Sequence, residues 1–260
     1  MPALAVVTAV FYGLISLLYL TRVFRQGDGL RHITCGAVVV VIIIHAVTIG
    51  SFCLRGFHPL VGVAGTLNLI AFLLVAVFFF VSLKWDLPVA GAVIVPFAMA
   101  LVLSAQLTPQ GPPPGALPHV LGKLHLTLVA MGVTALALAS AVAVGYLRQN
   151  RALQSNQLLA LESTAPALST LDRLSLRLTL VGFPLFVLAV ITGALWSYHL
   201  HEGFRIEHAL SGLILLIYLV LVSARISIGL RGRRAAILTL SGFFVTALVL
   251  AIYMARRVLS

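Results

Sequence analysis

The sequence predicts an all-α fold: a polytopic integral membrane bundle of about eight transmembrane helices. Hydrophobic residues make up 61% of the 260 residues and charged residues only 9%, and the mean hydropathy is +1.14. The apolar share of soluble domains is nearer half. The apolar residues fall in runs close to the ~20 residues that cross a hydrocarbon core of about 30 Å. Because strand-type alternation is absent, these runs predict helices, which satisfy their own backbone hydrogen bonds in lipid.

Eight such runs divide the chain, and no soluble domain is left over, so we expect a single membrane domain over residues 1–260. The proline-rich connection at 108–118 cannot be helical and ends the fourth span. The polar connection at 148–172 is expected to be a surface loop, with Thr170 capping the sixth span. The predicted spans are residues 2–21, 33–54, 61–83, 87–107, 119–147, 174–197, 208–229 and 235–254.

The distribution of basic residues predicts the orientation. The connections after the first, third, fifth and seventh spans hold 12 of the 17 Lys and Arg residues. By the positive-inside rule these connections are cytoplasmic, and both termini are expected on the outer, periplasmic side. The net charge of +11 is then explained by topology and anionic headgroups, and nucleic acid is not expected as a partner. No basic residue precedes the first apolar run, so a cleavable signal peptide is not expected.

Several functional classes lack their motifs. Cys35 and Cys53 lie 18 residues apart on one predicted helix, about 27 Å at the helical rise, so they cannot pair. No Cys-x-x-Cys-His is present, so the protein is not itself a c-type cytochrome. A nucleotide-binding loop, a nucleophile elbow and a His-Glu-x-x-His zinc helix are also absent. With only six acidic residues as well, enzymatic activity is not expected.

Histidine is the residue present in excess of what packing needs. Ionisable groups inside a span are costly and usually face protein, a cavity or a ligand, and His45 lies within the second span. His125 lies near the outer start of the fifth span, on a face where Gly132 and Ala139 suit close contact with a helix or a flat ligand. His208 begins the seventh span on the same side. We therefore expect three histidines to converge in the outer leaflet, where a neutral imidazole can ligate haem iron; alternatively, each only bridges helices.

The connection between the sixth and seventh spans is also rich in histidine. His199 and His201 lie there with His208, and water or headgroups can satisfy the first two. Trp196 and Tyr198 are expected in the aromatic belt at the membrane surface.

Several stretches of the chain resemble the cytochrome c assembly protein family, which includes CcsA and the HemX-like membrane proteins. The strongest are PALSTLDRLSLRLTLVGFPLFVLAVITGALW at 166–196 and GLRGRRAAILTLSGF at 229–243. His45-Ala46 and residues 125–147 are similar to the histidine-bearing helices of the family. The resemblance covers nearly the whole chain. It implies haem handling at the outer face of a bacterial inner membrane, together with other cytochrome c biogenesis proteins.

One segment departs from the family pattern. In the assembly factors proper, a tryptophan-rich segment containing Trp-Asp-Pro-Lys-Glu follows a Thr-Gly-Ala-x-Trp turn. Here the turn is kept at 192–196, but residues 197–208 replace the segment. The resemblance therefore implies an accessory, HemX-like role, with His125 and His45 as the candidate axial ligands of haem iron. His208 and Arg205 are the candidates to meet the haem propionates, since a guanidinium fork pairs with a carboxylate.

Other functions remain open at this point. A cofactor-free scaffold or regulatory subunit would use the histidines only to bridge helices. A transporter of a small solute would show internal symmetry and broken helices, and no convincing repeat is present. An electron-transferring cytochrome b would need histidine pairs stacked across the membrane, whereas the inner half offers only His32.

Overall fold

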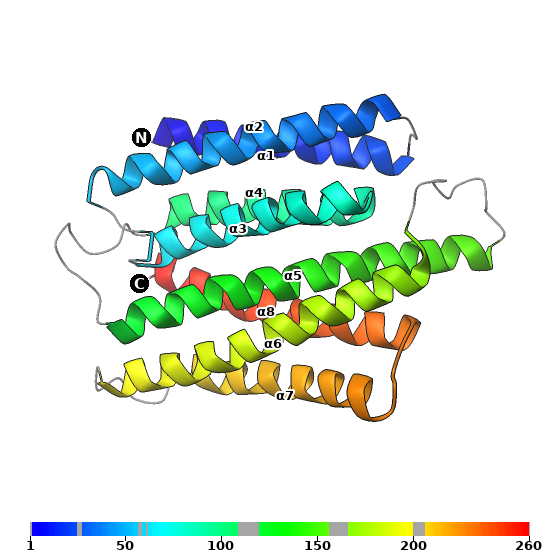
Figure 1. Cartoon of the computed structure of the whole chain (residues 1–260). Helices are drawn as coiled ribbons and strands as arrows, with labels where there is room; N and C mark the ends of the chain where they lie inside the picture. Colours follow the sequence, from blue (N-terminus) through cyan, green and yellow to red (C-terminus); the bar gives the residue numbers. More distant parts are fainter. Residues whose placement is uncertain are drawn as a thin grey trace.

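The computed structural model describes residues 2–24, 28–56, 59–60, 62–108, 120–155, 166–199 and 206–259. These residues form eight α-helices long and apolar enough to cross a membrane, which confirms the predicted fold class (Figure 1). The described ranges contain no strand. The helices are α1 (Pro2–Phe24), α2 (Asp28–Cys53), α3 (Gly62–Lys84), α4 (Pro88–Leu107), α5 (Val120–Gln154), α6 (Leu168–His199), α7 (Ile206–Ser227) and α8 (Arg233–Leu259).

The connection between α5 and α6 is shorter than expected. The helix α5 continues to Gln154 and α6 begins at Leu168, so much of the polar stretch at 148–172 is helical. Thr170 does not cap α6: it lies in the first turn, where its backbone N–H donates to the carbonyl of Ala167. Helical hydrogen bonds are local, so a helix continues past the apolar run wherever no breaking residue stops it.

The helices form two groups of four that meet at α5. In the first group, α1 and α3 each pack against both α2 and α4; in the second, α6 and α8 each pack against both α5 and α7. The helix α5 also packs against α3 and α4 of the first group, and Figure 1 shows it on the side of the second group that faces the first. Its most apolar stretch is 67% buried, more than that of any other helix. Thus α5 is the central element of the bundle.

Small residues allow α5 and α6 to approach closely. A Cβ added at Gly132 of α5 would lie 3.1 Å from the backbone nitrogen of Phe186, and one at Gly182 of α6 would lie 2.9 Å from Cγ of Leu136. In lipid, the hydrophobic effect does not drive helices together, so helix association depends on van der Waals packing. Small side chains favour it because they let the two backbones approach closely.

Both chain ends lie at the same end of the bundle (Figure 1), as an even number of spans requires. We call this end the terminal end and the other the basic end, because the latter holds Arg22, Arg148 and Arg225. The positive-inside rule predicts that the basic end faces the cytoplasm. Cys35 and Cys53 both lie on α2 and both are free.

Candidate functional site

His125 is fixed between α5 and α6 near the terminal end. Its Nδ1 lies 2.7 Å from the carbonyl oxygen of Ala189. A carbonyl only accepts, so Nδ1 carries the proton, and in the neutral imidazole Nε2 then carries the lone pair. The ring is only partly buried. The hydrogen bond therefore fixes the direction of the Nε2 lone pair, on a ring that the α5–α6 pair does not fully enclose.

The neighbours of this imidazole come from the Thr-Gly-Ala-x-Trp stretch, which is helical. A Cβ at Gly193 would lie 2.7 Å from Cε1 of His125 and 2.9 Å from its Nδ1, so only glycine leaves room for the ring. The Trp196 ring lies with its centroid 6.0 Å from that of His125, tilted by 49°. Residues three apart share a helix face, so Gly193 and Trp196 face α5 together. Trp196 also covers Gly122, where a Cβ would lie 3.1 Å from the indole.

The indole of Trp196, a residue expected in the aromatic belt, packs against α5 beside His125. Tyr198, two residues further on, is exposed, as a belt residue would be. The spacing of three residues between Gly193 and Trp196 could have predicted this packing, because it puts both on the helix face that makes the close α5–α6 contact.

His45 is enclosed within the first helix group. None of its surface is exposed, and its Nδ1 lies 2.8 Å from the hydroxyl of Tyr12 on α1. The rings of Tyr12 and Phe72 meet it edge-on, with centroids 5.6 and 5.7 Å away. These contacts join α1, α2 and α3 around one imidazole.

A second polar residue, Asn68 on α3, lies one helical turn from Phe72 and is also buried. Neither His45 Nε2 nor Asn68 Oδ1 has a partner in hydrogen-bonding geometry. The Asn68 Nδ2 donates to the carbonyl of Ala64 instead. One turn away, the hydroxyls of Thr8 and Thr48 lie 2.9 Å apart. This cluster was not predicted, although polar residues at helical spacing in a span, such as Thr8 and Tyr12, indicate a helix face turned toward protein.

The structure does not place His45 and His125 in contact with one another. His45 is held by α1 and α3, and His125 is held by α6. His208 lies in the first turn of α7 and is partly buried, while Arg205 lies outside the described residues. Within the described ranges, no three His, Cys, Asp or Glu side chains form a metal-binding group. Of the three predicted site residues that the structure describes, His125 combines a partly buried ring with a hydrogen bond that fixes its orientation.

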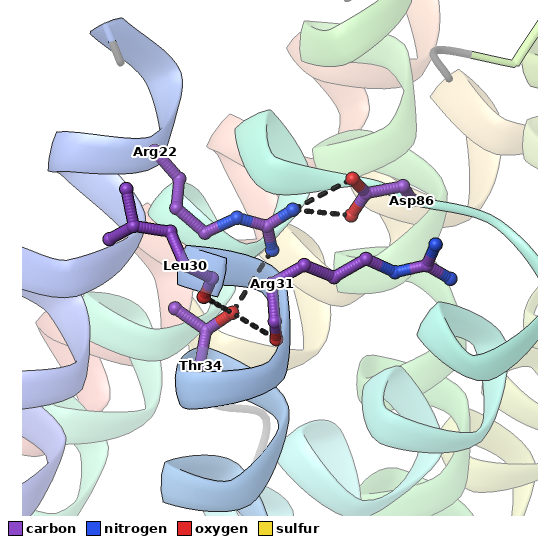
Figure 2. A network of polar contacts seen from close by, with 5 residues as sticks. All are labelled: Arg22, Leu30, Arg31, Thr34 and Asp86. Atoms are coloured by element: carbon purple, nitrogen blue, oxygen red, sulfur yellow. Dashed lines mark hydrogen bonds and ion pairs between the residues drawn. The ribbon is translucent and has the colours of Figure 1, made fainter. Parts of the chain in front are cut away.

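The basic end holds a network centred on Arg22 (Figure 2). The Nη2 of Arg22 donates to both carboxylate oxygens of Asp86 at 2.7 Å, and Nη1 donates to the hydroxyl of Thr34 at 3.1 Å. The hydroxyl of Thr34 in turn donates to the carbonyls of Leu30 and Arg31. Because Arg22 is 6% exposed and its charge is fully paired, this network fastens α1 and α2 to the α3–α4 connection and leaves no open ligand position.

The eight helices of the described ranges, each long and apolar enough to cross a membrane, define the class of this protein as a polytopic helical membrane protein. A model of the family described as "Cytochrome C assembly protein" matches residues 2–259. The chain therefore belongs to the cytochrome c assembly protein family.

Individual relatives agree with this family. The chain is 26% identical over 259 residues to a cytochrome c biogenesis protein CcsA of Guillardia theta, covering 89% of this chain and 86% of that protein. It is 41% identical over 78 residues to CcsA of Prochlorococcus marinus, covering 29% of this chain and 25% of the relative. With CcsA of a Picosynechococcus species it is 33% identical over 94 residues, 32% of this chain and 28% of the relative. No solved structure matches the chain.

Proposed function

We propose that this protein is a haem-handling or accessory factor in cytochrome c biogenesis at the bacterial inner membrane, and that His125 ligates haem iron near the terminal end. Membership of the cytochrome c assembly family supports the process. The positive-inside rule supports placing His125 toward the outer side. The local geometry of His125 supports its role as a ligand.

The hydrogen bond from His125 Nδ1 to Ala189 carries this proposal. Metal-ligating histidines nearly always donate the other ring N–H to a carbonyl or carboxylate, which fixes the tautomer and the ring orientation. His125 has this arrangement at 2.7 Å. The neighbouring indole of Trp196 offers an aromatic surface against which a flat macrocycle can pack. Haem, when bound, would supply an iron that accepts an imidazole nitrogen as a ligand, and His125 would hold it.

The other predicted site residues take different places in the proposal. His208 and Arg205, at and before the start of α7, are proposed to meet the haem propionates. His45 remains a second candidate ligand because its Nε2 has no hydrogen-bond partner. However, Tyr12 and Phe72 contact its ring edge-on and none of its surface is exposed, so ligation there requires these side chains to move.

The absorption spectrum of the detergent-purified protein after haem reconstitution tests the proposal. We expect a Soret band that is lost or strongly shifted in His125→Ala, and that is unchanged in His32→Ala at the basic end, the matched control. The His45→Ala spectrum separates a two-ligand site, in which the band shifts, from a site built on His125 alone. Absence of a band in the unmodified protein, or an unaltered band in His125→Ala, would overturn haem ligation by His125.

A cofactor-free scaffold or regulatory subunit is the second candidate. The replacement of the tryptophan-rich segment by residues 197–208 favours it, as does the enclosed cluster around His45, which joins three helices. This function predicts that substituting either histidine lowers thermal stability without any spectral change. The same purified samples distinguish the two candidates.

A further inference from the structure

The connection between α7 and α8 concentrates positive charge at the basic end. Residues 224–234, with the sequence ARISIGLRGRR, contain four arginines and no acidic residue, and α8 contains no acidic residue either. Arg231, Arg233 and Arg234 are exposed. In Figure 1 this connection lies at the end of the bundle opposite the two termini.

Arg225, at the end of α7, has unused hydrogen-bond donors. Arg225 is 6% exposed, and its Nε and Nη2 have no hydrogen-bond partner. Its nearest counter-charge is Asp172 of α6, with 3.5 Å between Nη2 and Oδ1. Its Nη1 donates to the backbone carbonyl of Asp172 across a similarly long 3.5 Å. Because Arg225 is buried, these two long contacts to Asp172 serve to tie the end of α7 to α6.

The residue before α8 also contacts Asp172. The backbone N–H of Gly232, the residue before α8, donates to Oδ1 of Asp172 at 3.4 Å, the oxygen that lies closest to Arg225. One carboxylate thus lies between the guanidinium and the positive end of the α8 dipole, where anions are stabilised. Gly232 has a positive φ of 73°, and a Cβ there would lie 3.2 Å from the Tyr146 hydroxyl, so the connection is held against α5.

Apolar side chains next to these arginines place the connection at the surface of the lipid. Ile226 and Ile228 are 68% and 76% exposed, which suits contact with acyl chains. The exposed Arg231 follows within a few residues. This succession, from apolar side chains to a basic cluster at the end of a span, is typical of the depth at which headgroup phosphates lie.

We propose that the α7–α8 connection binds the headgroup phosphate of an anionic phospholipid. Arg231, Arg233 and Arg234 and the first turn of α8 contact the phosphate, while Arg225 and Asp172 hold the connection in place. The acyl chains lie along the exposed face of α7. This site is independent of haem and lies at the opposite end of the bundle from His125.

Lipid binding to the full-length protein in detergent micelles tests this site. Phosphatidylglycerol is expected to bind saturably and to raise the midpoint of thermal unfolding, whereas phosphatidylcholine at the same mole fraction has little effect. In Arg231→Gln/Arg233→Gln/Arg234→Gln, phosphatidylglycerol affinity is expected to fall roughly 100-fold, because each guanidinium in direct contact with the phosphate contributes about fivefold through charge-assisted hydrogen bonds. Native mass spectrometry counts the bound lipid, and intrinsic fluorescence follows unfolding.

A matched control removes three arginines from the same end of the bundle but away from the connection: Arg31→Gln/Arg148→Gln/Arg151→Gln. This variant is expected to keep phosphatidylglycerol affinity within about threefold. Equal losses in both variants would show that only the general surface charge matters and would overturn the site. Equal binding of phosphatidylcholine would overturn it, and so would full stabilisation by inorganic phosphate alone.

Discussion

The two halves of the bundle use the same kinds of polar residue in opposite ways. In α1–α4, His45 is fully enclosed and Arg22 makes two short bonds to one carboxylate. In α5–α8, His125 is partly exposed and Arg225 lies 3.5 Å from its carboxylate with donors unused. A histidine or arginine in a span is therefore not a functional signal by itself. The two histidines differ in whether the ring remains partly exposed, and the two arginines, which are equally buried, differ in how closely they contact their carboxylate.

The largest expected effect comes from the short ion pair of the first half. Asp86→Ala leaves the buried Arg22 charge without its carboxylate, and breaking a buried pair on one side costs about 3–5 kcal/mol. Thermal or denaturant unfolding in detergent measures the loss. The matched variant Asp172→Ala removes two longer contacts, to the Arg225 guanidinium at 3.5 Å and to the Gly232 N–H at 3.4 Å, so the expected cost is about 1–3 kcal/mol. Equal losses would contradict the difference between the two halves.

Gly193→Ala tests the α5–α8 half of the bundle, at the contact that orients His125. The added Cβ would lie 2.7 Å from His125 Cε1, so the ring must move and its hydrogen bond to Ala189 lengthens. We expect a weakened or shifted haem band together with an overpacking cost of about 1–3 kcal/mol. Gly212→Ala on α7 is the control, since a Cβ there meets nothing within 4 Å. A wild-type spectrum in Gly193→Ala would argue against the orienting role of this contact.

Tyr12→Phe tests the α1–α4 half of the bundle, at the enclosed His45, and has the smallest expected effect. The substitution removes the hydroxyl 2.8 Å from His45 Nδ1 and keeps the aromatic contact. Hydrogen bonds between membrane helices contribute about 1 kcal/mol, so a loss of that size is expected in the unfolding assay. The haem spectrum should not change. A spectral change in Tyr12→Phe would instead place His45 in the haem site and remove the distinction drawn between the two histidines.

The local parts of the fold were predictable from the sequence, because lipid imposes a simple rule. Each predicted span has its helix, since a run of about 20 apolar residues must satisfy its backbone hydrogen bonds internally. The ends were less predictable: α5 and α6 extend through polar residues that hydropathy assigns to a loop. The resemblance that identified the family also came from local stretches such as 166–196, and the family match over 2–259 confirms it.

The membrane class, the eight spans and the family were therefore predictable, because all of them depend on residues close together along the chain. Which polar side chains meet was visible only in the folded bundle. It encloses His45 with Tyr12 and Phe72, and it sets Trp196 beside His125. The physical reason is that hydropathy reports the depth of a residue in the membrane but not its direction around the helix. Helix packing fixes that direction, and with it the difference between a satisfied histidine and one able to bind a ligand.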